Sequence, residues 1–168
     1  MCKAFASILV LFAAFTLTAC GDTQSGQQYT EAPVSDTENT MVAVSESVAY
    51  TITQTVEALG DRAKSVTMVS KIDTSQLDDQ QKEDISADQG RYQQLSEDIP
   101  GVEYSSKQDG ATLITEIRMP LDNPQVLKQL IDAGLLQISS ENGETPQQVS
   151  LQEMKLTLQD QGYTVTMK

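Results

Sequence analysis

The chain of 168 residues contains no histidine and no tryptophan, and it has only two cysteines. The lack of histidine excludes Ser/His and Cys/His catalysis, histidine-ligated metals and histidine general bases. Basic residues are also scarce, because 11 Lys and Arg stand against 24 Asp and Glu and give a formal net charge of −13. Binding of nucleic acid needs Lys and Arg to neutralise phosphates, so the sequence argues against a nucleic-acid partner.

The one long apolar run lies near the N-terminus, from Ala4 to Ala19, directly behind the basic residue Lys3. This run is shorter than the roughly 20 residues that a helix needs to span the hydrocarbon core of a bilayer. A basic start followed by a short apolar run is typical of a signal peptide. We therefore predict that residues 1–19 form a signal peptide that is removed from the mature protein.

The apolar run ends in the sequence Leu-Thr-Ala-Cys-Gly, with the cysteine at position 20. Small residues directly before a cysteine resemble a bacterial lipobox, and the sulfur of Cys20 can form a thioether with a diacylglycerol. Two or three acyl chains would hold the protein firmly at a membrane, whereas one chain gives marginal binding. We predict lipidation of Cys20 and a location at the cell membrane, facing outside the cytoplasm. The alternatives are a secretory signal cut elsewhere and an uncleaved anchor. A monoderm surface and a diderm envelope both stay open.

Residues 20–40 form a polar segment rich in Gly, Ser, Thr and Gln. Low hydrophobicity with net negative charge predicts disorder, so we interpret this segment as the lipidated Cys20 followed by a tether. As a flexible coil it would span roughly 25 Å. An edge strand around Tyr29–Val34 is the alternative interpretation. Cys2 would leave with the signal peptide, so the mature domain would fold without a disulfide although export permits one.

Residues 41–168 are long enough for a single domain. Its core must be mainly aliphatic, because all three phenylalanines fall before residue 16. Apolar residues recur at even spacing from Val48 to Ala58 and again from Val66 to Ile72, on either side of Gly60. This period of two predicts a long antiparallel hairpin whose apolar positions share one buried face. Met41–Ser45 is predicted as a further strand.

The pattern then becomes helical. Asp, Glu and Gln dominate Ser75–Ile99, while apolar residues recur at intervals of three, four and seven, which predicts a long amphipathic helix. A second hairpin is predicted around Asp109-Gly110. Two helices follow, one begun by Asn123-Pro124 and one by a capping box at Ser150, and a strand from Tyr163 closes the chain. This order predicts an α+β domain in which helices pack on one face of an antiparallel sheet built from hairpins.

Three stretches carry a resemblance to a known family. They are the lipobox at Cys20, the sequence Ile99–Glu103 leading into a hairpin, and the sequence Val149–Met154 with its later Gly162-Tyr163. With them the chain resembles the YehR-like family of small bacterial lipoproteins of uncharacterised function, in the order of elements over residues 41–168. The resemblance implies an α+β domain on a lipid anchor. It implies no known reaction, so Cys20 is the one functional residue that it provides.

Five carboxylates gather on the predicted long helix, namely Asp78, Asp79, Glu83, Asp84 and Asp88. One interpretation is a weak Ca²⁺ site or a docking face for a cationic partner. Ca²⁺, however, takes roughly six to eight oxygens that converge from a loop, whereas helical spacing spreads these side chains around a cylinder. We therefore predict a solvated acidic face, with no metal and no cofactor.

Glu103 and Glu116, on adjacent strands of the second hairpin, are the nearest candidates for a pair of hydrolytic carboxylates. Such chemistry needs two carboxyls across a cleft, and both residues alternate with apolar neighbours as solvent-facing charges do. No phosphate-binding loop or nucleophile motif occurs. Four tyrosines fall at inward-facing positions, which favours core packing over a platform for sugar rings. These four are Tyr50, Tyr92, Tyr104 and Tyr163.

The sequence thus predicts a membrane-anchored lipoprotein without catalytic activity, whose domain binds an unknown envelope protein or ligand. A carboxylate-dependent hydrolase of the cell envelope is one alternative. A solute-binding lipoprotein of a transporter is the other, although such proteins usually have two lobes and are longer.

Overall fold

The structure is a computed structural model that describes residues 37–136 and 146–168. The predicted signal peptide, Cys20 and the predicted tether as far as residue 36 lie outside the described residues, and so does most of the predicted polar loop 139–146. The described residues form one sheet of six strands with three α-helices. The strands are β1 (Glu38–Glu46), β2 (Tyr50–Leu59), β3 (Arg62–Asp73), β4 (Glu103–Asp109), β5 (Thr112–Pro120) and β6 (Thr164–Met167). The helices are the 3₁₀ turn η2 (Thr74–Gln76), α1 (Asp79–Asp98), α2 (Pro124–Asp132) and α3 (Leu151–Asp160).

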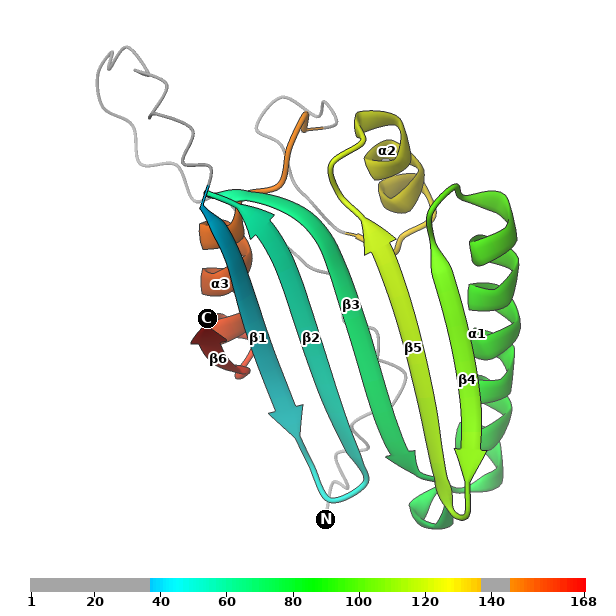
Figure 1. Ribbon diagram of the computed structural model, residues 1–168. Helices are drawn as coiled ribbons and strands as arrows, with labels where there is room; N and C mark the ends of the chain where they lie inside the picture. Colours follow the sequence, from blue (N-terminus) through cyan, green and yellow to red (C-terminus); the bar gives the residue numbers. More distant parts are fainter. Residues whose placement is uncertain (1–36, 137–145) are drawn as a thin grey trace, which may run out of the picture.

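The strands lie in the order β4-β5-β3-β2-β1-β6, and every neighbouring pair is antiparallel. The three α-helices lie on one side of this sheet, with α1 along β4, α2 near the end of β5 and α3 behind β1 (Figure 1). After β5 the chain therefore crosses the helical side and returns at the opposite edge, where β6 pairs with β1. This arrangement confirms the predicted α+β class with helices on one face.

Buried and more exposed side chains alternate along β2, β3 and β5, and the buried ones form the inner face of the sheet. Val56, Val66 and Met119 occupy one row across these strands, and all three are buried. Val48 is the exception to the predicted even series, because 95% of its surface is exposed. The chain turns at Val48, where the Ser47 hydroxyl accepts hydrogen bonds from the backbone N–H groups of Ala49 and Tyr50. This local turn interrupts the alternation of inward and outward side chains.

The first strand begins earlier than predicted. Glu38, Asn39 and Thr40, which were predicted as the end of the tether, belong to β1, where they pair with the end of β2. The Asn39 amide also donates to the Gly60 carbonyl at 2.9 Å, which fixes the start of β1 beside the β2–β3 turn. Glu38 and Asn39 extend beyond the part of β1 that pairs with β6, and they are exposed or partly exposed. Their polar character therefore gave no strand pattern in the sequence.

The long helix begins later than predicted. Residues from Thr74 to Gln76 form a 3₁₀ turn, and α1 starts only at Asp79, behind the cap residue Asp78. Asp73 caps the 3₁₀ turn and Asp78 caps α1, each with its side chain. The stretch that the periodicity predicted as one helix is therefore divided into two helical segments. The predicted end at Ile99 is confirmed, because Ile99 is the C-cap of α1.

The two later helices start where the sequence predicts. Asn123 caps α2 by accepting the backbone N–H groups of Gln125 and Val126. Ser150 caps α3 by accepting the N–H of Glu153 at 3.2 Å, and Asp61 reinforces this cap from the β2–β3 turn. The Asp61 carboxylate accepts the Gln152 N–H at 2.8 Å and the Ser150 hydroxyl at 2.7 Å, which ties α3 to the sheet.

The outer face of the sheet carries mainly threonine and valine in its centre, and no helix among the described residues covers it (Figure 1). Thr53, Thr55 and Val44 are typical of this face and are only partly exposed, because β-branched side chains pack on one another along the pleated surface. The hydrophobic core therefore lies between the inner face and the helices, and the site described next lies in that same layer.

Candidate functional site

The acidic residues at the start of α1 serve the helix itself. The Asp78 carboxylate accepts the Gln81 N–H at 2.8 Å, and the Gln81 side chain accepts the Asp78 N–H at 2.9 Å. Asp79 lies 3.7 Å from the ammonium nitrogen of Lys82. The N-terminus of α1 is thus closed by its own capping box and offers no open backbone donors at Asp78 and Gln81.

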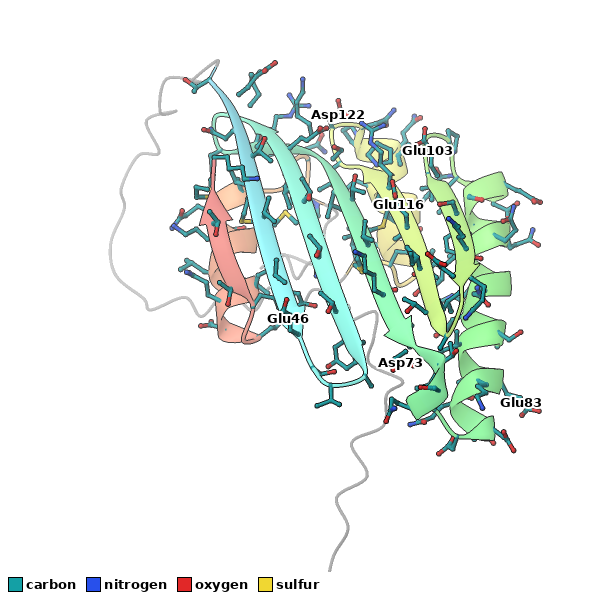
Figure 2. The ribbon with its side chains drawn as sticks, turned by 60° about the horizontal axis from the view of Figure 1, so that its bottom comes forward. Glu46, Asp73, Glu83, Glu103, Glu116 and Asp122 are labelled. Carbon is teal, nitrogen blue, oxygen red and sulfur yellow. The ribbon has the colours of Figure 1, made fainter. Side chains whose placement is uncertain are left out.

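The remaining acidic residues of the cluster point in different directions. Asp84 accepts the Gln80 amide at 3.1 Å, and Glu83 lies on the outer side of α1, away from the sheet (Figure 2). Burial raises the pKa of Asp88, and the charge of Arg91 acts against this shift. Within residues 37–136 and 146–168, no three acidic or cysteine side chains are grouped so that they could hold a metal ion.

Glu103 and Glu116 do lie close together, but not in a cleft. Glu103 pairs with Arg118 across β4 and β5, while Glu116 pairs with Ser105, so the two glutamates are diagonal neighbours. Both are exposed on the outer face of the sheet, as Figure 2 shows. A glycoside-hydrolysing pair needs a sugar ring held between its carboxyls, and this flat surface gives no such enclosure.

The four tyrosines pack in or against the core, as predicted, and in two separate places; Tyr92 is buried and the other three are partly buried. Tyr92 and Tyr104 meet between α1 and β4 with their ring centroids 5.9 Å apart. Tyr50 and Tyr163 pack against the core on β2 and just before β6. Because the tyrosines do not line one open surface, they form no platform for stacking a sugar.

Alkaline pH is expected to destabilise the fold through three of these tyrosines. Burial raises the pKa of Tyr92, Tyr104 and Tyr163 above the ordinary value of about 10. The unfolded chain therefore ionises first, so the stability is complete below about pH 10 and is lost as the pH rises through the folded values. Each unit of difference between the folded and unfolded pKa is worth about 1.4 kcal/mol.

Phenolate absorbance near 295 nm and urea denaturation between pH 9 and 11.5 check this expectation. The native protein should ionise fewer tyrosines at pH 10.5 than the urea-unfolded protein does. Tyr104→Phe should reduce the loss of stability between these pH values. Identical phenolate titrations for the native and unfolded protein would contradict it.

Three buried polar residues on the inner face were not predicted. The Ser70 and Thr115 hydroxyls lie 2.5 Å apart across β3 and β5, within hydrogen-bond distance. Gln54 is 1% exposed, and its carbonyl oxygen has no hydrogen-bond partner among the described residues. The signal was present in the sequence, because Gln54 occupies an inward position between Ile52 and Val56 in the alternating series of β2.

A cavity of about 450 Å³ lies in the same inner layer, between the first half of α1 and the hairpin of β4 and β5. We call it the α1–β4 groove. Its helical side is formed by Lys82, Ile85 and Gln89. The remaining lining residues come from the connection before α1 and from the two strands, and they are Thr74, Leu77, Ser106, Gln108 and Leu113.

The groove exists because the facing sides of α1 and β4 both change from aromatic to non-aromatic side chains at the same position along the interface. Towards the end of α1, Tyr92 packs on Tyr104 and the interface is closed. Towards its start, Gln89 and Lys82 replace apolar residues on the side of α1 that faces the sheet. Ser106 follows Tyr104 on the inner face of β4, since side chains alternate along a strand. Small and polar side chains therefore face each other across a gap.

The predicted lipid-bearing residue, Cys20, lies outside the described residues, so the structure leaves this prediction untested. Among the helices that the structure describes, none combines the length and the apolar character needed to cross a bilayer.

Comparison with known proteins identifies the fold. No family model matches the chain, and no curated protein matches it. The NMR structure of Escherichia coli YehR superposes with a TM-score of 0.53 at 14% identity, covering 78% of this chain and 92% of that one. The chain has the YehR-like fold. An NMR structure of a protein from Streptococcus pneumoniae TIGR4 is also similar, with a TM-score of 0.47 and 14% identity, covering 89% of this chain and 97% of that one.

The YehR-like fold confirms the resemblance that the sequence predicted. At 14% identity the likeness concerns the fold and does not bring a ligand, a reaction or a site with it. Function must therefore be argued from the residues of this chain.

Proposed function

We propose that this protein is a membrane-anchored lipoprotein of the cell envelope whose YehR-like domain binds a ligand or partner without catalysing a reaction. The single observation that carries the anchor is the run of small residues ending at Cys20, placed directly behind a basic and apolar leader. The first strand that the structure describes begins at Glu38, so the polar residues between Cys20 and this strand would separate the lipid from the sheet.

The side chains of the domain favour binding over catalysis. The sequence has no histidine and no cysteine after Cys20, so two common nucleophile systems lack their parts. The lining of the α1–β4 groove includes no carboxylate, and the paired glutamates lie on the opposite face of the sheet. A groove with apolar and hydrogen-bonding walls but no general acid or base is suited to holding a molecule.

The mass of the mature protein tests the anchor directly. Purified from its own membrane, the protein should begin at Cys20 and should carry additional mass equal to a diacylglycerol or to two or three acyl chains. Peptide sequencing by mass spectrometry should place this addition on the N-terminal peptide. A mature protein that begins elsewhere, or that begins at Cys20 without added mass, would refute the proposal.

A further inference from the structure

We propose that the α1–β4 groove binds a small aliphatic carboxylate, with its hydrocarbon chain against Leu77, Ile85 and Leu113 and its carboxylate at Lys82. This inference builds on the proposed binding role and names the chemical class of the ligand. The walls of the groove, its charge and its closed inner end support this assignment.

The floor of the groove is aliphatic. Leu77 and Leu113 are each only 6% exposed and belong to the core, and Ile85 packs against that core from α1. None of the lining side chains is aromatic, so flat rings find no stacking partner there. A flexible hydrocarbon chain is the apolar group that fits such a surface.

Lys82 gives the groove its charge. It is the only ionisable side chain in the lining, although the protein as a whole is strongly acidic. Lys82 also stands in the first turns of α1, where the positive end of the helix dipole disfavours a cation. The helix dipole therefore gives no reason for a cation at this position.

The ammonium group of Lys82 remains accessible to a ligand. Its side chain is 51% exposed, and its ion pair with Asp79 is long, at 3.7 Å, and exposed. Exposed pairs of this kind are weak, so a ligand carboxylate can displace Asp79 at little cost. One cation calls for one anionic group, which favours a monocarboxylate over a ligand with several charges.

The groove ends where the helix and strand meet again. The Gln89 amide donates to the Ser106 hydroxyl at 3.1 Å, and beyond this bond Tyr92 closes the interface with Tyr104. The cavity of about 450 Å³ lies at the low end of the range for small-molecule sites. A chain of medium length, with its head at Lys82 and its end toward Gln89, therefore matches the groove better than a whole membrane lipid.

Methyl NMR on the intact protein in lipid nanodiscs tests this inference. Hexanoate, octanoate and decanoate should shift the methyl signals of Leu77, Ile85 and Leu113 but not those of Leu156, which lies on the exposed side of α3. Affinity should rise roughly two- to fourfold with each added methylene group, because apolar surface is buried. No shift of the three groove signals up to the solubility limit of decanoate would overturn the proposal.

Charge variants test the head group. Lys82→Gln should weaken octanoate binding about fivefold, in keeping with an exposed charge pair, and leave octanol binding unchanged. Lys82→Arg should keep most of the affinity. Lys107→Gln is the matched control, because this substitution makes the same change in net charge and Lys107 lies on the outer face of β4, away from the groove. Equal weakening by Lys82→Gln and Lys107→Gln would refute a role for Lys82, as would octylammonium binding as tightly as octanoate.

The failure of this inference can be distinguished from the failure of the lipid anchor. If the mature protein proves to carry no acyl chain, the same titration is run in buffer without nanodiscs. The mass of the N-terminal peptide then decides the anchor, and the methyl shifts decide the ligand. Melting temperatures of the lysine variants, which should match the wild type, show that the groove remains folded.

Discussion

Replacing Cys20 by serine is expected to reduce the incorporation of radiolabelled palmitate into the protein to background. The thioether bond to a diacylglycerol requires sulfur, and a serine hydroxyl at the same position is a far weaker nucleophile. Metabolic labelling followed by electrophoresis measures the effect. Labelling is the decisive measurement, because an uncleaved precursor would keep its apolar run 4–19 and could still enter a detergent phase.

The sequence contains its own control for this experiment. Cys2→Ser removes the other cysteine, which lies in the predicted signal peptide, and it should leave palmitate incorporation unchanged. The Cys20→Ser protein should also retain its cooperative thermal unfolding, since the described domain begins at residue 37 and contains no cysteine. Persistent labelling of Cys20→Ser would contradict lipidation at this residue.

Replacing Leu127 by alanine is expected to lower the free energy of unfolding by about 2–5 kcal/mol, which is the range for a leucine removed from a rigid core. Leu127 belongs to α2, is 0% exposed and is part of the hydrophobic core. The helix is short and is held by its three buried side chains, Val126, Leu127 and Leu130. The close-packed core around Leu127 would relax only partly around the cavity that alanine leaves.

Urea denaturation followed by circular dichroism measures this loss. Leu156→Ala is the matched control, because Leu156 also lies on a helix but is 52% exposed, and its loss should cost less than about 0.5 kcal/mol. A change at Leu127 no larger than that at Leu156 would show that α2 does not pack on the sheet as described.

Local signals that act over two to four residues predicted most of the elements. Asp109-Gly110 predicts the turn between β4 and β5, and Gly110 indeed adopts a φ of +59°. Asn123 followed by Pro124 predicts the start of α2 at the residue where the structure has it. Such signals succeed because the turn or cap is stabilised by the same few residues that encode it.

Boundaries without such a signal were predicted less well. The start of β1 at Glu38 depends on pairing with residues near Leu59, which lie far away in the chain. The exposure of Val48 depends on where the turn after β1 falls, and a periodic pattern cannot show this. In both cases the deciding contact is made between segments and not within one.

The candidate site was beyond sequence analysis for a related reason. Lys82 and Gln89 look like members of a solvated helix face when α1 is considered alone. They become the wall of a groove only because Ser106 and Gln108, on a strand that follows α1 in the chain, replace the apolar partners that would fill the gap. A cavity forms between two facing surfaces, here those of α1 and β4, whereas a periodic sequence pattern predicts only which residues share one face of a single helix or strand.

The β2–β3 turn lies at the start of the long strand β3, which runs from Arg62 to Asp73 (Figure 1). The α1–β4 groove lies at the other end of this strand, because its lining includes Thr74, the residue directly after β3. Twelve strand residues span roughly 35–40 Å. Since β1 starts beside the β2–β3 turn, the chain enters the described domain at the end of β3 opposite the groove. Attachment of the preceding segment at the start of β1 would therefore leave the lining residues of the groove, at the other end of β3, uncovered.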